Sequence, residues 1–255
     1  MARTYVITGS ASGIGAATAE LLRSRGEIDA DLSRPSERAA AAVKASELAG
    51  GVVDGVIACA GISAPISKTM AINYFGVTEL LTALLPALRA SDAPRAAVVS
   101  SMASLQPSVP ELVEAALGGD EAATLAIGDA LAAKGPEAGY ANYSGSKRAL
   151  SRWVRRASIS EDWAGAGIPL NAVAPGTVIT PMTAELLRTP EGAAMVDAAV
   201  PRPLNSHQPA ESIAQLLVWL TSPENTHMAG QTIYCDGGAD ATLRGDDIWS
   251  WNDPR

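Results

Sequence analysis

The chain has 255 residues, of which 47% are hydrophobic, and it carries a formal net charge of −8 at pH 7. This length and hydrophobic content suit a single α/β domain over residues 1–255. An acidic chain is poorly suited to bind nucleic acid or an anionic membrane, because both attract Lys and Arg. We therefore expect a small organic molecule as its ligand.

The chain runs from Met1 into an apolar stretch within a few residues, which leaves no room for a secretion signal. No apolar run approaches the roughly 18 residues that suggest a membrane span. The two cysteines, Cys59 and Cys235, lie in apolar, strand-like stretches, where buried reduced thiols are more common than a disulfide or metal ligands. We expect a cytoplasmic protein without a metal site.

Short β-branched runs alternate with Ala- and Leu-rich segments of helical period, which is the pattern of βαβ units. A leucine stripe over 77–88 predicts a core-facing helix with a kink at Pro86 near its end. The predicted fold is α/β, a Rossmann-like doubly wound parallel sheet with helices on both faces. Strands are predicted at 4–8, 52–59, 96–101, 168–174 and 232–235, and further helices at 140–163 and 209–220.

One expected strand is missing after the first helix, which ends near Gly26. A dinucleotide-binding unit continues into an apolar strand that ends in a carboxylate about 20 residues after the last glycine. Instead, Glu27, Asp29 and Asp31 follow, and so many charges cannot form a strand buried on both faces. Either the unit is truncated or residues are omitted from the sequence. We favour the omission, because skipping the strand would leave a gap beside the first one.

A glycine-rich turn, with the sequence TGSASGIG, joins the first strand to the first helix at 8–15. Glycines there permit a tight turn, and the helix N-terminus offers free N–H groups and a positive dipole end to a pyrophosphate. A turn without a ligand is the alternative interpretation. The predicted cofactor residues in this segment are Gly9, Ser12, Gly13, Ile14 and Gly15.

Tyr143 and Lys147 are four residues apart in a predicted helix, so their side chains share one face. A phenol has a pKa near 10, and a neighbouring cation favours its ionised form. Lys147 would therefore make Tyr143 a usable acid and base, although an exposed helix pair is the alternative. Tyr140 has no lysine four residues later, so we treat it as a decoy.

Ser100 and Ser101 end an apolar strand, where parallel sheets place their ligands. A hydroxyl there can polarise a carbonyl or alcohol oxygen of a substrate, whereas a capping serine is the alternative interpretation of this motif alone. Together the glycine turn, the serines and the Tyr143/Lys147 pair resemble the short-chain dehydrogenase/reductase family over nearly the whole chain.

The resemblance implies that Ser101, rather than Ser100, acts with Tyr143 and Lys147, and that Asn73 completes a proton relay through water. Cys59 stands where the family has Asn, and Asp31-Leu32 matches the pair beside the adenine. The cofactor contacts implied outside the glycine turn are Asp31, Leu32, Cys59, Ala60, Gly61, Tyr143, Lys147, Pro175, Gly176, Val178 and Thr180.

Ser101 and Tyr143 lie 42 residues apart, far more than in the ordinary family pattern. The sequence of the segment between them, about 105–139, predicts helices. A helical insert between 96–101, which corresponds to the family's fifth strand, and the catalytic helix resembles the bacterial 3α-hydroxysteroid dehydrogenase/carbonyl reductase branch. That branch implies hydride transfer between a nicotinamide cofactor and an apolar secondary alcohol or ketone, such as a 3α-hydroxysteroid or a xenobiotic carbonyl. It also implies altered subunit contacts, so we expect a homodimer.

Other activities remain open from the sequence: a coniferyl-alcohol-type or other alcohol dehydrogenase of the same family, an epimerase or dehydratase of the extended branch, or an NAD(P)-sensing regulator without catalysis. No Lys or Arg occurs at 10–12 to meet a 2′-phosphate, so we expect NAD rather than NADP as the cofactor. An apolar lip over the substrate, or alternatively packing of its own loop, is expected from Met182, Leu186, Leu187 and Met195.

Overall fold

The computed structural model describes residues 3–23 and 30–250. At its centre is a five-stranded sheet in the order β1-β2-β3-β4-β7, in which all neighbouring strands are parallel. The five predicted strands are confirmed, with ends that differ by a few residues. They are β1 (Tyr5–Thr8), β2 (Gly55–Ala58), β3 (Arg95–Val99), β4 (Leu170–Pro175) and β7 (Thr232–Cys235).

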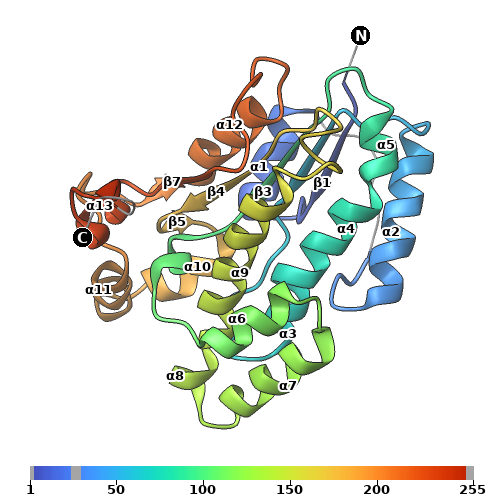
Figure 1. Ribbon diagram of the computed structural model, residues 1–255. Helices are drawn as coiled ribbons and strands as arrows, with labels where there is room; N and C mark the ends of the chain where they lie inside the picture. The colour runs from blue at the N-terminus through green and yellow to red at the C-terminus, as the bar shows by residue number, and fades with distance from the viewer. Residues whose placement is uncertain (1–2, 24–29, 251–255) are drawn as a thin grey trace.

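Helices cover both faces of the sheet, as predicted (Figure 1). On one face, Ile57 and Val173 pack against helices α1 and α12, whereas Val56 and Ala172 point to the other face. This alternation is the two-residue period of a strand with two buried sides. The helices of the first face are α1 (Gly13–Leu21) and α12 (Ala210–Leu220), and those of the second are α2 (Pro35–Leu48), α4 (Val77–Ala83), α5 (Leu85–Arg89) and α9 (Ala141–Ala157).

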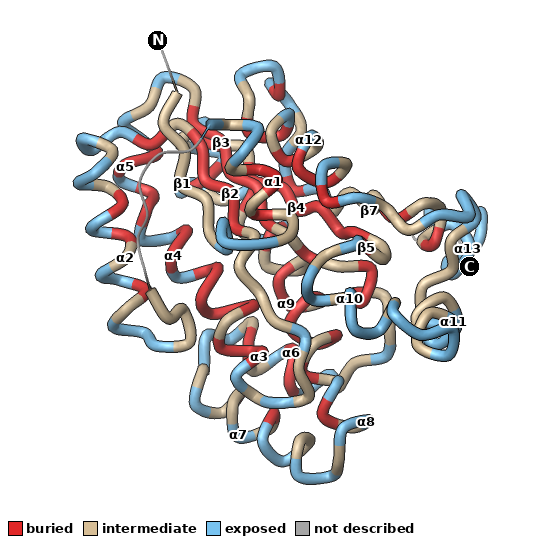
Figure 2. The backbone as a smooth tube through the Cα atoms, turned by 180° about the vertical axis from the view of Figure 1, so that it is seen from behind, coloured by how far each residue is buried: buried red, intermediate tan, exposed pale blue. Residues whose placement is uncertain are grey.

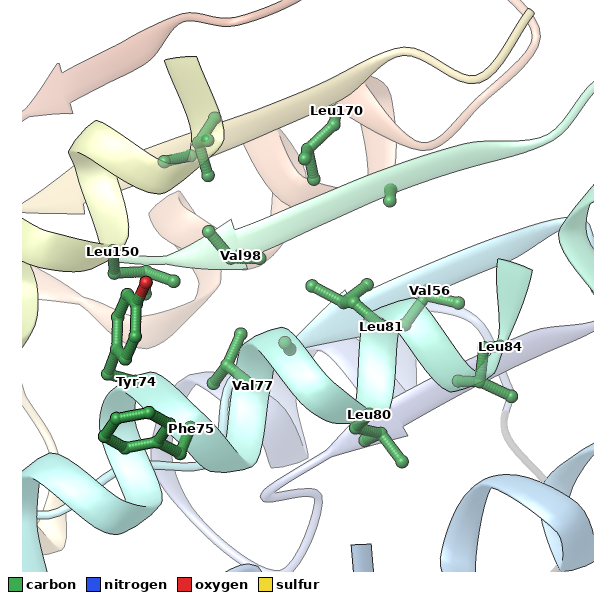
Figure 3. Packing of buried hydrophobic residues seen from close by; sticks show 14 of the residues in the cluster. Val56, Tyr74, Phe75, Val77, Leu80, Leu81, Leu84, Val98, Leu150 and Leu170 are labelled. Atoms are coloured by element: carbon green, nitrogen blue, oxygen red, sulfur yellow. The ribbon is translucent and has the colours of Figure 1, made fainter. Parts of the chain in front are cut away.

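The leucine stripe of α4 forms the centre of the larger core, as predicted (Figure 3). Leu81 is completely buried and lies beside Val56 and Val98 of the sheet. Each such side chain contributes about 1.5–3 kcal/mol when it is fully buried. The kink expected at Pro86 is a break: α4 ends at Ala83 and α5 starts at Leu85, since proline cannot donate to the preceding turn.

A π-helical turn, η1 (Ala71–Gly76), follows α3 (Lys68–Met70) and leads into α4. It carries Asn73, whose side chain is completely buried. Gly76 ends this turn, and a Cβ there would lie 2.9 Å from the carbonyl oxygen of Leu32. The absence of a side chain at Gly76 thus lets the segment after residue 30 approach η1 closely.

The predicted helical insert is confirmed between β3 and α9, and it projects from one end of the body (Figure 1). It follows η2 (Met102–Leu105) and consists of α6 (Pro110–Leu117), α7 (Glu121–Ala132) and α8 (Pro136–Gly139). Leu112 of α6 packs against α9 at Gly145, where a Cβ would lie 2.9 Å from its Cδ2 atom. Asp120 caps α7 by accepting a hydrogen bond from the backbone N–H of Ala123.

Helix α9 ends at Ala157, earlier than the 140–163 range predicted. Trp163 instead lies in a turn, where its ring meets Trp153 edge to face at 6.1 Å. The segment between β4 and α12 holds elements too short for periodicity to show. They are β5 (Val178–Ile179) paired with β6 (Gln208–Pro209), α10 (Pro181–Leu187) and α11 (Pro190–Ala199); α13 (Ala239–Arg244) follows β7.

Within the described ranges β1 is an edge strand, and its residues are only half-buried, whereas those of β2 are fully buried (Figure 2). The expectation of omitted residues after Gly26 concerns positions 24–29, which lie outside the described residues. In the part of the chain that the structure describes, no helix has the length and apolarity to cross a membrane.

Candidate active site

The register of the sheet aligns Thr8, Ala58 and Val98 in one row, so the segments that follow these strands begin at the same edge. The backbone N–H of Ala60 donates to the hydroxyl of Thr8 over 3.0 Å, which joins the ends of β1 and β2. Carboxyl ends of parallel strands are where open α/β sheets bind their ligands.

The glycine-rich turn is held against Ala60, after the end of β2. Gly9 has φ +68°, and a Cβ there would lie 2.8 Å from the backbone N of Ala60. Gly13 also has a positive φ, of 54°. A Cβ at Gly15 would overlap the carbonyl oxygen of Gly9. A side chain would therefore displace the turn from this position.

The first turn of α1 faces a cleft along this edge. Ser12 is its N-cap residue, but the Ser12 side chain makes no capping hydrogen bond. The first N–H groups of a helix lack partners within it, and the helix dipole adds positive potential at the same end. Open donors beside a turn that only glycine can form fit the pyrophosphate of a dinucleotide.

The cleft brings together most of the predicted site. It also includes Ile62, Val99, Ser100, Pro181 and Thr183, which the sequence reasoning did not assign. Asn73, Asp31 and Leu32 do not line it. The predicted residues that do are Gly9, Ser12, Gly13, Ile14, Gly15, Cys59, Ala60, Gly61, Ser101, Tyr143, Lys147, Pro175, Gly176, Val178 and Thr180.

Tyr143 and Lys147 lie on the face of α9 that meets the end of β3. The Lys147 ammonium lies 5.8 Å from the centre of the Tyr143 ring and donates a 2.9 Å hydrogen bond to the carbonyl oxygen of Val99. Ser101, two residues after Val99, caps η2 by accepting from the backbone N–H of Ala103 at 3.1 Å. A strand end and one helix face thus place phenol, ammonium and hydroxyl in one cleft.

Burial shifts the pKa of both groups on α9. It raises the pKa of Tyr143, and the hydroxyl of Ser101 opposes this by hydrogen bonding. It lowers the pKa of Lys147 from 10.5 to about 8, with the negative form of Cys59 acting in the opposite direction. In the protein without cofactor, loss of water therefore raises the pKa of Tyr143, where the Tyr143/Lys147 spacing led us to expect a lowered one.

The two neighbouring serines have different surroundings. The hydroxyl of Ser100 donates to the backbone carbonyl of Lys147 at 3.1 Å and lies 2.7 Å from the hydroxyl of Ser151, so it joins β3 to α9. The hydroxyl of Ser101 accepts from η2, lines the cleft and lowers the pKa of Tyr143 by hydrogen bonding, so it is the serine that faces a ligand.

Asn73 lies behind the cleft. Its amide nitrogen donates to the carbonyl of Ile62 at 2.9 Å and to the hydroxyl of Ser146 at 3.1 Å, while its oxygen accepts from the N–H of Ile62 at 2.9 Å. A Cβ on Gly61 would be 3.1 Å from the Asn73 oxygen and 3.6 Å from the Lys147 nitrogen. The two side chains thus approach one another across Gly61.

Asp31 and Leu32 lie outside the cleft, beside α2. Hydrogen bonds from the side chain and backbone of Ser33 lower the pKa of Asp31 to about 2. The carbonyl of Leu32 accepts a 2.7 Å hydrogen bond from the buried side chain of Arg38.

Both cysteine thiols, those of Cys59 and Cys235, are free. Burial raises the pKa of Cys59 to about 12 and also raises that of Cys235.

Comparison with known proteins places these features in a family. A family model described as enoyl-(acyl carrier protein) reductase matches residues 111–240. The chain is 34% identical to the 3-alpha-hydroxysteroid dehydrogenase/carbonyl reductase of Comamonas testosteroni, over 94% of this chain and 97% of that protein. The chain belongs to the short-chain dehydrogenase/reductase family. It is therefore an NAD(P)-dependent oxidoreductase, and the predicted resemblance and enzyme class are confirmed.

Solved structures of the same family share this fold. The crystal structure of 3-alpha-hydroxysteroid dehydrogenase from Pseudomonas sp. B-0831, complexed with NADH, has a TM-score of 0.85 and 36% identity, covering 96% of this chain and all of that one. A gluconate 5-dehydrogenase structure from Beutenbergia cavernae, described as putative and NAD(P)-dependent and with bound NADP, has a TM-score of 0.71 and 26% identity over 94% and 97% of the chains. The Rossmann-like fold prediction is confirmed.

A second cavity, of about 870 Å³, opens beside Tyr143. The dehydrogenase/reductase motifs do not predict it, because its walls come from four separated parts of the chain. Tyr140, treated as a decoy, lies in its lining, whereas Met182 of the predicted lip lines the cofactor cleft and Leu186 and Met195 are exposed. The cavity is lined by Leu105, Gln106, Pro107, Ser108, Val109, Leu131, Glu137, Ala138, Tyr140, Ala141, Tyr143, Ser144, Ala199 and Leu243.

Proposed function

We propose that this dehydrogenase/reductase acts on bulky, apolar, ring-bearing secondary alcohols and ketones, such as a 3α-hydroxysteroid or a xenobiotic carbonyl compound. The second cavity carries the proposal. Its volume is in the range of roughly 300–1,000 Å³ usual for small-molecule sites, its walls are mostly apolar, and it reaches the side chain of Tyr143. The Comamonas testosteroni relative, by its name, acts on substrates of this kind.

Ser101 and Tyr143 hold the substrate oxygen in this proposal. A bound nicotinamide supplies or accepts the hydride at the carbon that carries this oxygen. In reduction, the neutral phenol of Tyr143 donates its proton to the oxygen as the carbonyl becomes an alcohol, and burial favours that protonated form. In oxidation, the proton of the alcohol passes to Tyr143 as the C–H bond breaks, and the Lys147 ammonium stabilises the phenolate that accepts it.

Lys147 also holds the ribose of the nicotinamide, and Asn73 completes a relay through water to Lys147. The shared approach of the two side chains to Gly61 supports this role for Asn73. Any side chain at Gly61 would occupy the space between them, so a glycine there leaves room for a bridging water. The amide of Asn73 is fully buried and held by Ile62, which gives the relay a rigid end.

NAD is the proposed cofactor in preference to NADP. Among the described residues lining the cleft, Lys147 is the only basic one. The Pseudomonas sp. B-0831 structure, by its description, holds NADH.

A substrate panel tests the function. Androsterone, coniferyl alcohol and cyclohexanol are oxidised with NAD⁺ or NADP⁺, and absorbance of the reduced cofactor gives kcat/KM. We expect androsterone with NAD⁺ to give the highest value. A higher value for coniferyl alcohol would replace the proposal with that alternative activity, and a preference for cyclohexanol would contradict a bulky substrate.

We also propose a cytoplasmic homodimer. The projecting insert supports an altered assembly, because it occupies space beside the body of the protein (Figure 1). Both thiols are free, as expected in a reducing compartment. Light scattering after gel filtration measures the assembly directly, and a mass of one chain, 26.1 kDa, would contradict the dimer.

A further inference from the structure

A second pair of side chains follows the proposed catalytic pair by one position on α9. Ser144 and Arg148 are four residues apart, like Tyr143 and Lys147, so they share the adjacent strip of the helix surface. Whereas the first pair faces the end of β3, this pair faces the segment 104–108, between η2 and the insert.

The guanidinium of Arg148 holds three parts of that segment at once. Its Nε donates to the carbonyl of Ser104 at 2.8 Å, one terminal nitrogen donates to the carbonyl of Gln106 at 2.6 Å, and the other donates to the hydroxyl of Ser108 at 2.8 Å. A planar group with fixed donors defines the position of several acceptors together, which a flexible lysine does not. Arg148 therefore fixes the shape of this loop as well as its distance from α9.

Ser144 adds a fourth contact from the same side. Its hydroxyl is buried and donates to the carbonyl of Pro107 at 2.9 Å. The acceptors on Ser104, Gln106, Pro107 and Ser108 are thus all bound by α9. No regular helix or strand orders the segment after Leu105, so these contacts define its conformation.

The clamped segment is a wall of the second cavity. Gln106, Pro107 and Ser108 line it together with Tyr143 and Ser144. On the far side, the amide of Gln106 reaches the carbonyl of Ala199 at 3.5 Å, at the end of α11. The loop thus runs from the catalytic helix toward α11, beside the space where a large substrate would extend from Tyr143.

Ser101 has its own support and does not depend on this clamp. It is fixed by the N–H of Ala103, and η2 is also joined to β7 through the hydroxyls of Ser104 and Tyr234, 3.0 Å apart. Loss of the Arg148 contacts should loosen the wall while the proton-transfer groups keep their places.

We propose that Ser144 and Arg148 are positioning residues that hold 104–108 as the wall of the substrate cavity and thereby determine the preference for bulky over small alcohols. This inference rests on the proposed function. A four-ring substrate contacts the wall, so a displaced wall weakens its binding. A single-ring alcohol occupies only the space beside Tyr143, so its turnover is little changed.

The test compares kcat and KM for androsterone and cyclohexanol at saturating NAD⁺. Arg148→Met should raise the KM for androsterone roughly ten- to hundredfold, because small displacements of positioning groups have effects of that size. The kcat for both alcohols should change by less than about threefold, as should kcat/KM for cyclohexanol. Arg148→Lys should restore part of the loss. Arg155→Met, an exposed arginine on the same helix, is the matched control.

Ser108→Ala tests the same clamp if Arg148→Met does not fold, since it removes one acceptor from the loop. It should raise the KM for androsterone and change kcat/KM for cyclohexanol by less than about threefold. An equal fall in kcat for both alcohols, or an unchanged ratio of their kcat/KM values, would refute the proposed role of Ser144 and Arg148. Suppose that Tyr143→Phe abolishes turnover, but Arg148→Met and Ser108→Ala keep the wild-type preference for androsterone over cyclohexanol. The proposed function then stands, and only this inference fails. If the wild-type protein oxidises neither alcohol, both fail.

Discussion

The ammonium of Lys147 donates a 2.9 Å hydrogen bond to the carbonyl oxygen of Val99 at the last residue of β3. This contact ties α9 to the sheet edge two residues before Ser101. Lys147 is only 5% exposed, so its charge is held with few water contacts. The arrangement that positions the ammonium for chemistry is therefore costly for folding.

Lys147→Met should stabilise the cofactor-free protein while it abolishes activity. The folded pKa of Lys147 is about 8, below the ordinary 10.5. At pH 7 the side chain is therefore still charged in the folded protein, where burial disfavours that charge. At 1.36 kcal/mol per pKa unit, the gain at pH 7 is up to about 3 kcal/mol, less the lost bond to Val99. Wild-type stability rises relative to the variant between pH 8 and 10.5, so the difference should shrink there.

Urea unfolding of both proteins at pH 7 and pH 10 measures this difference, with exposed Lys134→Met as the control. A gain that is equal at both pH values would show that desolvation of the ammonium is not its cause.

Tyr143→Phe should reduce kcat by about 10²–10⁴-fold, because it removes the group that exchanges the proton. Binding of NADH, followed by fluorescence, should change by less than about threefold, since the ring remains in place. Tyr140→Phe, which changes a half-exposed phenol in the second cavity, should retain kcat. Near wild-type turnover of Tyr143→Phe would refute the assignment.

Gly9→Ala should unfold the glycine turn or weaken cofactor binding strongly. The new Cβ would meet Ala60, and its positive φ alone costs an L-residue about 1–2 kcal/mol. Gly50→Ala separates the two effects, because Gly50 has φ +64° with nothing within 4 Å of its Cβ position. We expect a loss of about 1–2 kcal/mol at Gly50 and a clearly larger one at Gly9 in thermal unfolding. Equal losses would mean that the close approach to Ala60 is unimportant.

Arg38→Met should destabilise the protein by about 1.5–3 kcal/mol, because it removes charged hydrogen bonds of a buried guanidinium while its carboxylate partners stay partly exposed. Its side chain is 1% exposed and binds both oxygens of Glu121 on the insert, at 2.7 and 2.9 Å, as well as Glu79 on α4. The ion pair of Arg152 and Glu114 also joins the insert to α9, but both side chains are exposed.

Arg152→Met should therefore change the free energy of unfolding by less than about 1 kcal/mol. Chemical denaturation of the two variants gives both values. Similar losses would indicate that burial does not distinguish these two pairs.

Much of the fold could be predicted because its signals are local. The β-branched runs marked the five strands of the central sheet, and helical period marked α4 and the insert. The two-residue strands β5 and β6 could not be found, since no period fits so short a run. The early end of α9 was missed because Trp163 is a buried apolar residue, as a helix would place it, but it lies in a turn after the helix.

The candidate site was predictable where chemistry follows a motif. The glycine turn, Ser101, Tyr143 and Lys147 all line one cleft. Their roles stay predictions, which the variants described above would test. Arg148 and the segment 104–108 carry no such motif. Their relation arises because α9 passes beside a loop that precedes it by forty residues in the chain.

The sequence by itself determined the order of chemical groups: which residues follow each strand, and which pair shares a helix face. Those properties depend on backbone periodicity, which is local. Only the tertiary structure decided the direction of the pKa shifts and the shape of the substrate space. The pKa of Tyr143 is raised rather than lowered because packing removes water from it, and the cavity beside it exists because loop, insert and α11 meet there.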